Sequence, residues 1–254
     1  MALPQGIDWI TGASSGIGKA LALKMAAEGR TVVISARSEE DLKTVAVEAD
    51  GLPGKVIPSP LDITDEAAVT AAVAEIEEEH GPLAVAVLNA GTHKPVLAAD
   101  MTVADFELLA RLNLLGTVAC LIAALKPMQA RGRGQIAVVA SVAGYIGLPT
   151  SAAYGMTKAG LINMTQALQP DLAAKGVTLQ LVNPGFVKTP LTDKNEFPMP
   201  FLMQPDKAAE RFYQGLESGR FEIVFPWRLA FILKILRALP MGLMLKVTKR
   251  MQPT

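Results

Sequence analysis

Short apolar runs rich in β-branched residues alternate with longer amphipathic stretches along most of the chain. The apolar runs have the length of strands, and the stretches between them have the length of helices. Seven runs predict strands, at residues 7–10, 31–35, 55–61, 85–88, 136–140, 177–182 and 221–225. Their alternation with helices predicts a doubly wound, mostly parallel α/β sheet of the Rossmann type, covered by helices on both faces.

Helix signals between these runs support that order. A helix over residues 16–28 should end at Gly29, and Ser38 with Asp41 resembles a capping box that opens the next helix. Asp65 and Glu66 favour the start of a helix that ends near residue 80. Long helices are predicted over 103–128 and 152–174. We find no internal repeat and no low-complexity linker, so residues 1–254 are expected to form one domain.

A glycine-rich turn, TGASSGIG over residues 11–18, separates the first predicted strand from the first helix. Gly12 permits a tight turn, Gly16 lets the backbone approach a pyrophosphate, and Gly18 lets helix and strand pack closely. The N–H groups of the helix start can bind the anion. A P-loop is the competing interpretation, but Ala13 and Ala20 stand where that motif needs Gly and Ser or Thr.

The composition narrows the function classes. The 254 residues are 50% hydrophobic and 19% charged, which indicates a globular chain. Lys plus Arg and Asp plus Glu number 24 each, so no basic excess suggests nucleic-acid binding. Cys120 is the only cysteine and His80 and His93 are the only histidines, so we expect neither a disulfide nor a metal site. His93 is expected to lie on an exposed loop.

The chain start has no basic segment followed by a long apolar run, so no signal peptide is predicted. No stretch of 18 uncharged apolar residues predicts a membrane-spanning helix. With a single cysteine, this favours a cytoplasmic location.

Tyr154 and Lys158 are four residues apart on a predicted helix and therefore share one face. A phenol can donate a proton to a developing alkoxide or remove one from an alcohol if its pKa falls from about 10 toward neutrality. A nearby ammonium group favours that fall by stabilising the phenolate. Taken alone, such a pair is typical of a helix surface.

The motifs together resemble the short-chain dehydrogenase/reductase superfamily over roughly residues 7–190. The glycine-rich turn, Asn89-Ala90-Gly91 after the fourth strand, Tyr154 with Lys158, and Pro184-Gly185 after the sixth strand occur in that family's order. Ser141 also lies 13 positions before Tyr154, as the family's active-site serine does.

The resemblance implies the role of each matching residue. Ser141 is expected to polarise the substrate oxygen, Tyr154 to act as acid/base, Lys158 also to bind the nicotinamide ribose, and Asn113 to hold a water for proton relay. The residues expected to bind the cofactor are Gly12, Ser14, Ser15, Gly16, Ile17, Gly18, Arg37, Asp62, Ile63, Asn89, Ala90, Gly91, Tyr154, Lys158, Pro184, Gly185, Val187 and Thr189.

Residues 35–37 favour NADP over NAD. An NAD enzyme usually places Asp or Glu near the end of the second strand to bind the ribose 2′-OH, and Ala36 stands at that position here. Arg37 can pair with a 2′-phosphate, although a solvated charge at a strand end is the alternative. Asp62 matches the family's adenine-contacting position, or is a plain turn residue.

The last quarter of the chain matches no family motif. Residues 191–215 are expected to form a substrate lid, since residues 197–203 are rich in Pro, Met and Phe. Residues 226–254 form an apolar, basic C-terminal extension in which Pro240 should break the helix. The extension either packs on the subunit or across a dimer, which we prefer, or contacts a membrane peripherally. We have no physical explanation for Asp8 within the first strand.

We therefore predict an NADP-dependent oxidoreductase that transfers a hydride between nicotinamide and an apolar carbonyl or alcohol, as a homodimer or tetramer. The alternative from another class is a nucleotide-sensing regulator that kept the fold without turnover.

Overall fold

Seven parallel strands form one sheet in the computed structural model, which describes residues 2–194 and 198–251. The strands are β1 (Ile7–Thr11), β2 (Thr31–Ser35), β3 (Lys55–Pro58), β4 (Leu83–Leu88), β5 (Gly134–Val139), β6 (Val177–Pro184) and β7 (Glu222–Phe225). Their order is β3-β2-β1-β4-β5-β6-β7. The predicted doubly wound sheet in a single domain is confirmed, and the order reverses between β1 and β4, where such sheets bind ligands.

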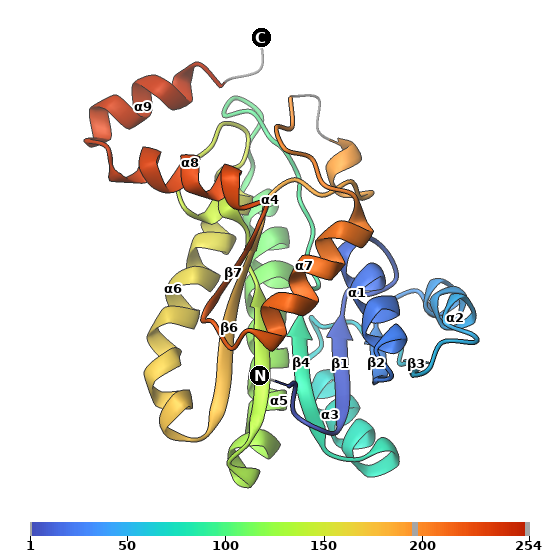
Figure 1. Ribbon diagram of the computed structural model, residues 1–254. Coiled ribbons are helices and arrows are strands. Elements are labelled where there is room, and N and C mark those ends of the chain that lie inside the picture. The colour runs from blue at the N-terminus through green and yellow to red at the C-terminus, as the bar shows by residue number, and fades with distance from the viewer. Residues whose placement is uncertain (1, 195–197, 252–254) are drawn as a thin grey trace.

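Helices cover both faces of this sheet (Figure 1). They are α1 (Gly16–Ala27), α2 (Glu39–Glu48), α3 (Glu66–His80), α4 (Val103–Leu109), α5 (Thr117–Arg131), α6 (Ala152–Ala174), α7 (Pro205–Glu217), α8 (Trp227–Ala238) and α9 (Met241–Lys249). One core cluster joins the sheet to α3, α5, α6 and α8. The other joins it to α1, α2 and α7. The central strands are therefore buried on both sides, as their continuous apolar runs predict, whereas the edge strand β3 is only partly buried.

Two predicted elements differ from the structure. The third strand ends at Pro58 instead of residue 61. The predicted helix over 103–128 is continuous but not uniform, because a π-helical segment, Ala110–Gly116, lies between α4 and α5. A π segment inserts an extra residue into a helical turn and is common at functional sites. This one contains Asn113.

Part of the predicted lid is a core helix. Residues 205–215 lie in α7, which packs on α1 and buries Ala208, Phe212 and Leu216 completely or almost so. The lid interpretation is wrong for these residues, because the apolar side of α7 closes the core. Residues 195–197 of the expected lid lie outside the described residues.

Asp8, unexplained by the sequence, forms a buried ion pair. Both of its carboxylate oxygens accept hydrogen bonds from Arg30, which lies just before β2 and also donates to the Pro4 carbonyl at 2.8 Å. Burial outweighs the attraction of Arg30 and raises the pKa of Asp8 to about 6. The pair ties the chain start to the sheet at the ends of the strands opposite the motifs.

The combined helix Val103–Arg131 is long and apolar enough, by length and composition, to cross a membrane. In this fold its apolar residues serve the core, because α5 packs on β4, β5 and α3. Cys120, Ala124 and Met128 are fully buried there.

Candidate active site

Polar groups join the glycine-rich turn to the end of β4. The Thr11 hydroxyl accepts hydrogen bonds from the Asn89 and Ala90 backbone N–H groups at 3.0 and 3.1 Å. The Asn89 amide donates to the Thr11 and Gly12 carbonyls at 3.1 and 3.0 Å. Asn89 therefore holds the end of its strand against the turn. Sequence reasoning did not identify the contribution of Thr11.

Gly12 shows why this turn requires glycine. Its φ is +66°, a conformation that other residues rarely adopt. A Cβ there would lie 2.6 Å from the Cα of Ala90. The turn is closed against the Asn89–Gly91 loop, while Ser15 and Gly16 begin α1 beside it at the same end of the sheet.

One cavity of about 790 Å³ brings half of the predicted site residues together. The predicted residues that line it are Ile17, Asn89, Gly91, Ser141, Tyr154, Lys158, Pro184, Gly185, Val187 and Thr189. They come from α1, the ends of β4, β5 and β6, and α6. The other predicted residues do not line it: Asp62 lines a second cavity, and Asn113 is completely buried.

Ser141, Tyr154 and Lys158 meet on one wall of this cavity. A hydrogen bond joins the side chains of Tyr154 and Ser141. The Lys158 ammonium lies 5.7 Å from the Tyr154 ring centroid and donates to the Val139 carbonyl at 2.9 Å. The arrangement thus places a proton donor, a second hydroxyl and a cation within one enclosed space.

Burial sets the protonation of this group. It raises the pKa of Tyr154, and the hydrogen bond from Ser141 only partly opposes it. It lowers the pKa of Lys158 to about 8. The expectation that the Lys158 ammonium brings the pKa of the Tyr154 phenol toward neutrality is therefore wrong for the side chains of this protein, because burial raises that pKa. Burial keeps Tyr154 protonated, in the state that donates a proton.

Asn113 lies behind the cavity and clamps a loop. Its amide oxygen accepts from the Thr92 N–H, and its amide nitrogen donates to the Thr92 carbonyl, both at 2.8 Å. It also donates to the Thr157 hydroxyl at 3.4 Å. The π-helical turn thus positions the loop after Gly91 next to the catalytic helix α6.

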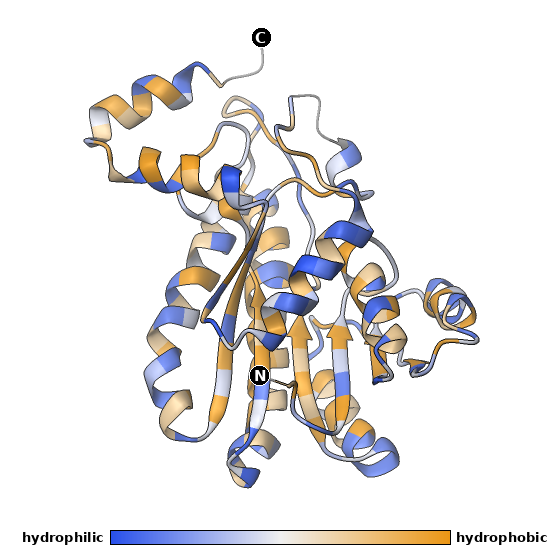
Figure 2. Cartoon of the chain, viewed as in Figure 1, coloured by the Kyte–Doolittle hydropathy of each residue, from blue (hydrophilic) through white to orange (hydrophobic). Residues whose placement is uncertain are grey.

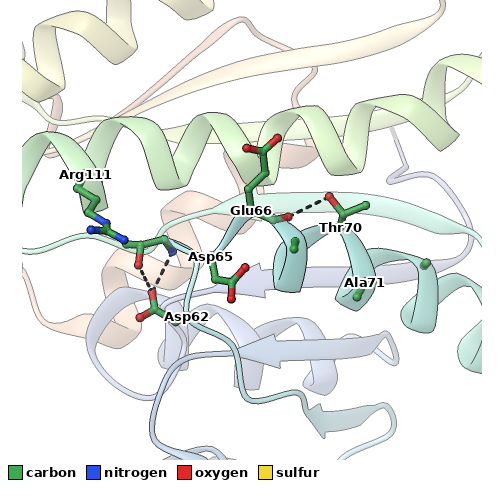
Figure 3. Close-up of a pocket in the computed structure, with 9 residues that line it drawn as sticks. Asp62, Asp65, Glu66, Thr70, Ala71 and Arg111 are labelled. Carbon is green, nitrogen blue, oxygen red and sulfur yellow. Dashed lines mark hydrogen bonds between the residues drawn. The ribbon is translucent and has the colours of Figure 1, made fainter.

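Arg37 and Asp62 lie together beyond the end of β2. Asp62 accepts hydrogen bonds from the Thr64 N–H and hydroxyl at 2.9 and 2.8 Å, and these bonds, helped by the charges of Arg37 and Arg111, lower its pKa. Figure 3 shows Arg111 beside this turn. The neighbouring cavity of about 1090 Å³ contains none of Ser141, Tyr154 and Lys158, so the smaller cavity is the candidate active site.

His93 lines the active-site cavity, and the expectation of an exposed loop histidine is wrong. Its ring centroid lies 4.5 Å from that of Tyr154. Two other lining residues, Thr150 and Phe201, have φ near +60°, which is unusual for residues other than glycine. Such backbone strain is concentrated at functional sites.

The lid and the C-terminal extension form the opposite wall. Its apolar residues are Leu191, Pro198, Pro200, Phe201, Leu229, Ile232, Leu233 and Met251. Both ends of the lid are held by backbone hydrogen bonds of 2.9 Å, from Lys188 to Met203 and from Met203 to Phe186. Sequence patterns alone did not predict that α8 would contribute to the site.

A polar network fixes α8 beside the cavity. Glu222 on β7 accepts from Tyr145 at 2.5 Å and from Asn183 at 2.9 Å, and it pairs with Lys234 of α8. Despite partial burial, these donors lower the pKa of Glu222. Leu229, on the inner side of α8, is buried against the domain. The preferred alternative, packing on the subunit, therefore holds for the inner face of α8.

A family model described as short chain dehydrogenase matches residues 8–198. The chain belongs to the short-chain dehydrogenase family. This confirms the resemblance and makes the chain an NAD(P)-dependent short-chain dehydrogenase/reductase enzyme instead of a regulator without turnover.

Similar proteins extend beyond the matched segment. An uncharacterized oxidoreductase of Myxococcus xanthus is 36% identical over 243 residues, 96% of each chain. A 3-oxoacyl-(acyl-carrier-protein) reductase of Thermotoga maritima is 36% identical over 84% of this dehydrogenase and 82% of its own length. A short-chain dehydrogenase from Sphingobium yanoikuyae, solved in complex with NADPH, has a TM-score of 0.82 at 26% identity, covering 94% and 95% of the two chains.

Proposed function

We propose that this enzyme uses NADPH to reduce an apolar carbonyl compound to an alcohol, with Tyr154 as the proton donor. The observation that carries the proposal is the shared cavity. It is lined by the motif residues at the ends of β4, β5 and β6, by Tyr154 with Ser141 and Lys158, and by an apolar opposite wall. The alcohol oxidation is the reverse of the same reaction.

The side chains of the cavity have complementary tasks. Ser141 and Tyr154 donate hydrogen bonds to the substrate oxygen, which orients the carbonyl and stabilises the developing alkoxide. Tyr154 then transfers its proton to that oxygen, acting as general acid. Lys158, charged below pH about 8, stabilises the resulting phenolate. Asn113 positions the loop after Gly91 and is assigned the proton-relay water, which would return a proton to Tyr154.

The nicotinamide cofactor fits the motif side of the cavity. Gly12, Ser14, Ser15, Gly16, Ile17 and Gly18 would bind its pyrophosphate at the start of α1, where helix N–H groups attract an anion. A side chain at Gly16 would lie 3.1 Å from Thr189, so glycine keeps this approach open. When bound, the cofactor supplies the hydride. Ile63, Asn89, Ala90, Gly91, Pro184, Gly185, Val187 and Thr189 are assigned to the rest of the cofactor.

Two cations support the preference for NADPH over NADH. Ala36 at the end of β2 offers no carboxylate to a ribose 2′-OH, and Arg37 next to it is exposed. Arg37 and Arg111 both act electrostatically on Asp62, so both cations lie in the surroundings of this carboxylate. This positive region can bind a 2′-phosphate, which a carboxylate at Ala36 would repel.

An apolar stripe supports assembly of identical subunits. Leu108 of α4, Leu115 of the π-helical segment and Ile122 of α5 are 53%, 61% and 47% exposed. A second subunit can cover exposed apolar side chains that are gathered on neighbouring helical segments. We assign the homodimer or tetramer to this surface. For the location we propose the cytoplasm, where the buried Cys120 remains a thiol.

A screen of ketones and aldehydes with NADPH, followed by absorbance at constant pH, tests the function. We expect turnover with apolar carbonyl compounds and NADPH, less with NADH, and none with the matched Tyr154→Phe protein. Absence of turnover with every carbonyl and alcohol, in both directions and with both cofactors, would contradict the proposal.

A further inference from the structure

We propose that α8 and α9 form a docking surface for an anionic phospholipid bilayer, from which the active-site cavity receives its substrate. The docking is independent of the reaction. The passage of a membrane-dissolved carbonyl compound rests on the proposed function. The three observations that carry the proposal are an uncovered apolar face, its surrounding cations and the position of the cavity mouth.

The uncovered face lies on the outer side of the two helices. Trp227, Phe231 and Ile235 follow one another at four-residue spacing along α8 and are 63%, 58% and 48% exposed. On α9, Met241 and Leu245 have the same four-residue spacing and are 66% and 55% exposed. We call these five residues the outer tail surface. The domain covers only the opposite side of α8, where Leu229 and Leu233 are buried. Figure 2 shows that hydrophobic residues predominate along this helix.

Cations surround this surface without balancing anions. After Glu222 the sequence contains no Asp or Glu but six basic residues. Lys234 is paired with Glu222. In the described part of the chain, the other five form no ion pair: Arg228, Arg237, Lys246, Lys249 and Arg250. Basic residues around an apolar face are typical of a helix that lies on an anionic membrane.

This charge pattern favours a bilayer over a second copy of the chain. A two-fold contact would bring the same patch of both subunits together and would place cations against cations. Anionic headgroups would neutralise them instead. Trp227 lies beneath the Arg228 guanidinium at 5.7 Å, a pairing suited to the boundary between headgroups and hydrocarbon.

Pro240 determines how the surface can meet a membrane. It separates α8 and α9, which have 12 and 9 residues, as the break predicted from the sequence requires. Neither helix approaches the roughly 20 residues that span a bilayer. The two short helices can instead lie in the plane of the interface. In Figure 1 they project beyond the carboxyl ends of the strands, at the end of the molecule that carries the active site.

The cavity opens beside the outer tail surface. Phe201 of the lid, Ile232 of α8 and Met251 after α9 all line the cavity and are 42%, 44% and 43% exposed. They therefore form an apolar rim, and Ile232 is next in sequence to Phe231. A long-chain carbonyl compound could pass from hydrocarbon to the cavity while its chain stays in contact with apolar groups.

Vesicle flotation tests the docking with the full-length protein and without substrate. We expect binding to phosphatidylcholine vesicles that contain a quarter phosphatidylglycerol at 50 mM NaCl, and loss of binding with pure phosphatidylcholine or at 500 mM NaCl. Phe231→Asp should bind at least tenfold more weakly. Val47→Asp, a control at a residue of α2 that is 67% exposed, should bind as wild type.

Charge removal provides a second measurement. Lys246→Gln and Lys249→Gln should each weaken binding about fivefold at low salt, the effect of one cation near an anionic surface. Lys175→Gln, at the end of α6, is the matched control and should have no effect. Absence of wild-type binding at low salt, or equal binding by Phe231→Asp and wild type, would overturn the docking. If wild type did not bind vesicles, and if Phe231→Asp had a different mass from wild type in light scattering, the surface would be a contact between copies of the chain.

The passage of substrate needs a comparison of two carbonyl compounds. Phe231→Asp should reduce a long-chain ketone in anionic vesicles several-fold more slowly than wild type, and a short water-soluble ketone at the same rate. Equal rates with the vesicle-borne ketone would refute passage from the membrane. If wild type reduced neither ketone, the proposed function would fail, whereas flotation would still decide the docking.

Discussion

The two walls of the active-site cavity are held in different ways. Ser141, Tyr154 and Lys158 belong to the ends of central strands and to α6, and their neighbours are tied together by backbone hydrogen bonds. The opposite wall comes from the lid and from α8, at the end of the chain. Backbone hydrogen bonds hold only the two ends of the lid, and α8 is fixed by its inner side and by the side chains of the Glu222 network.

This difference separates the chemistry from the choice of substrate. The wall with Tyr154 requires residues of particular types at fixed positions, because proton transfer demands hydrogen-bond geometry. The apolar wall requires only shape and hydrophobicity, which many sequences provide. Changes in the first wall should therefore affect turnover, and changes around the second should affect substrate binding.

Tyr154→Phe should have the largest effect. The substitution removes the proton donor but keeps the ring, so we expect turnover to fall at least ~100-fold while NADPH binding is kept. Steady-state kinetics and calorimetric titration would measure both. Tyr145→Phe is the matched control, since Tyr145 contacts Glu222 outside the cavity. Near-wild-type turnover of Tyr154→Phe would refute the assigned acid.

Arg37→Ala should change the relative affinities for NADPH and NADH without changing the apolar wall of the cavity. Wild type is expected to bind NADPH more tightly than NADH, and the substitution should narrow that gap by about 1–3 kcal/mol, the contribution of a charged hydrogen bond. Titration of both cofactors gives the difference, with the exposed Arg133→Ala as control. Equal wild-type affinities for the two cofactors would be inconsistent with the assignment.

The pH dependence of reduction should report Lys158. Because burial lowers the pKa of this amine to about 8, it loses its charge above that pH, whereas the raised pKa of Tyr154 keeps the phenol protonated. We expect kcat/KM to be about tenfold lower at pH 9 than at pH 7, as a single ionisation requires. A profile that stays flat to pH 10 would show that the charge of Lys158 is not needed.

The same shift predicts a change in stability. In the unfolded chain Lys158 stays protonated up to its ordinary pKa near 10.5, so between about pH 8 and 10.5 the unfolded state binds more protons. The contribution of this residue to the free energy of unfolding should therefore rise with pH in that window. Lys158→Met should remove the rise in denaturant unfolding measured from pH 7 to 10.

Glu222→Gln should have the smallest effect and should act on the other wall. It removes the ion pair with Lys234 that holds α8 to the sheet. We expect a loss of about 1 kcal/mol of stability and a few-fold higher KM for the carbonyl substrate, with unchanged NADPH affinity. Glu28→Gln, in an exposed pair on α1, is the control. If Glu222→Gln changed only the affinity for NADPH, the idea that the opposite wall affects substrate binding and not cofactor binding would be contradicted.

Most of the fold and of the motif wall could be predicted from the sequence, because their signals are local. Strand runs, helix caps and the spacing of Tyr154 and Lys158 need only neighbouring residues. The pairing of Asp8 with Arg30 and the contribution of α8 to the cavity depend on contacts across the fold. The same holds for Phe212: the sequence predicts a lid over residues 191–215, whereas contacts across the fold bury this side chain in the core.

The backbone bridge between Val187 and Met203 has a consequence for the evolution of this protein. Because Val187 pairs with Met203, the segment between them starts and ends at the same place on the protein. Its length can change at little entropic cost, since doubling a loop costs only about 0.6 kcal/mol. A new loop could be exchanged at this one point, and descendants of one catalytic scaffold could thereby acquire new substrates through insertions that leave the strands in register.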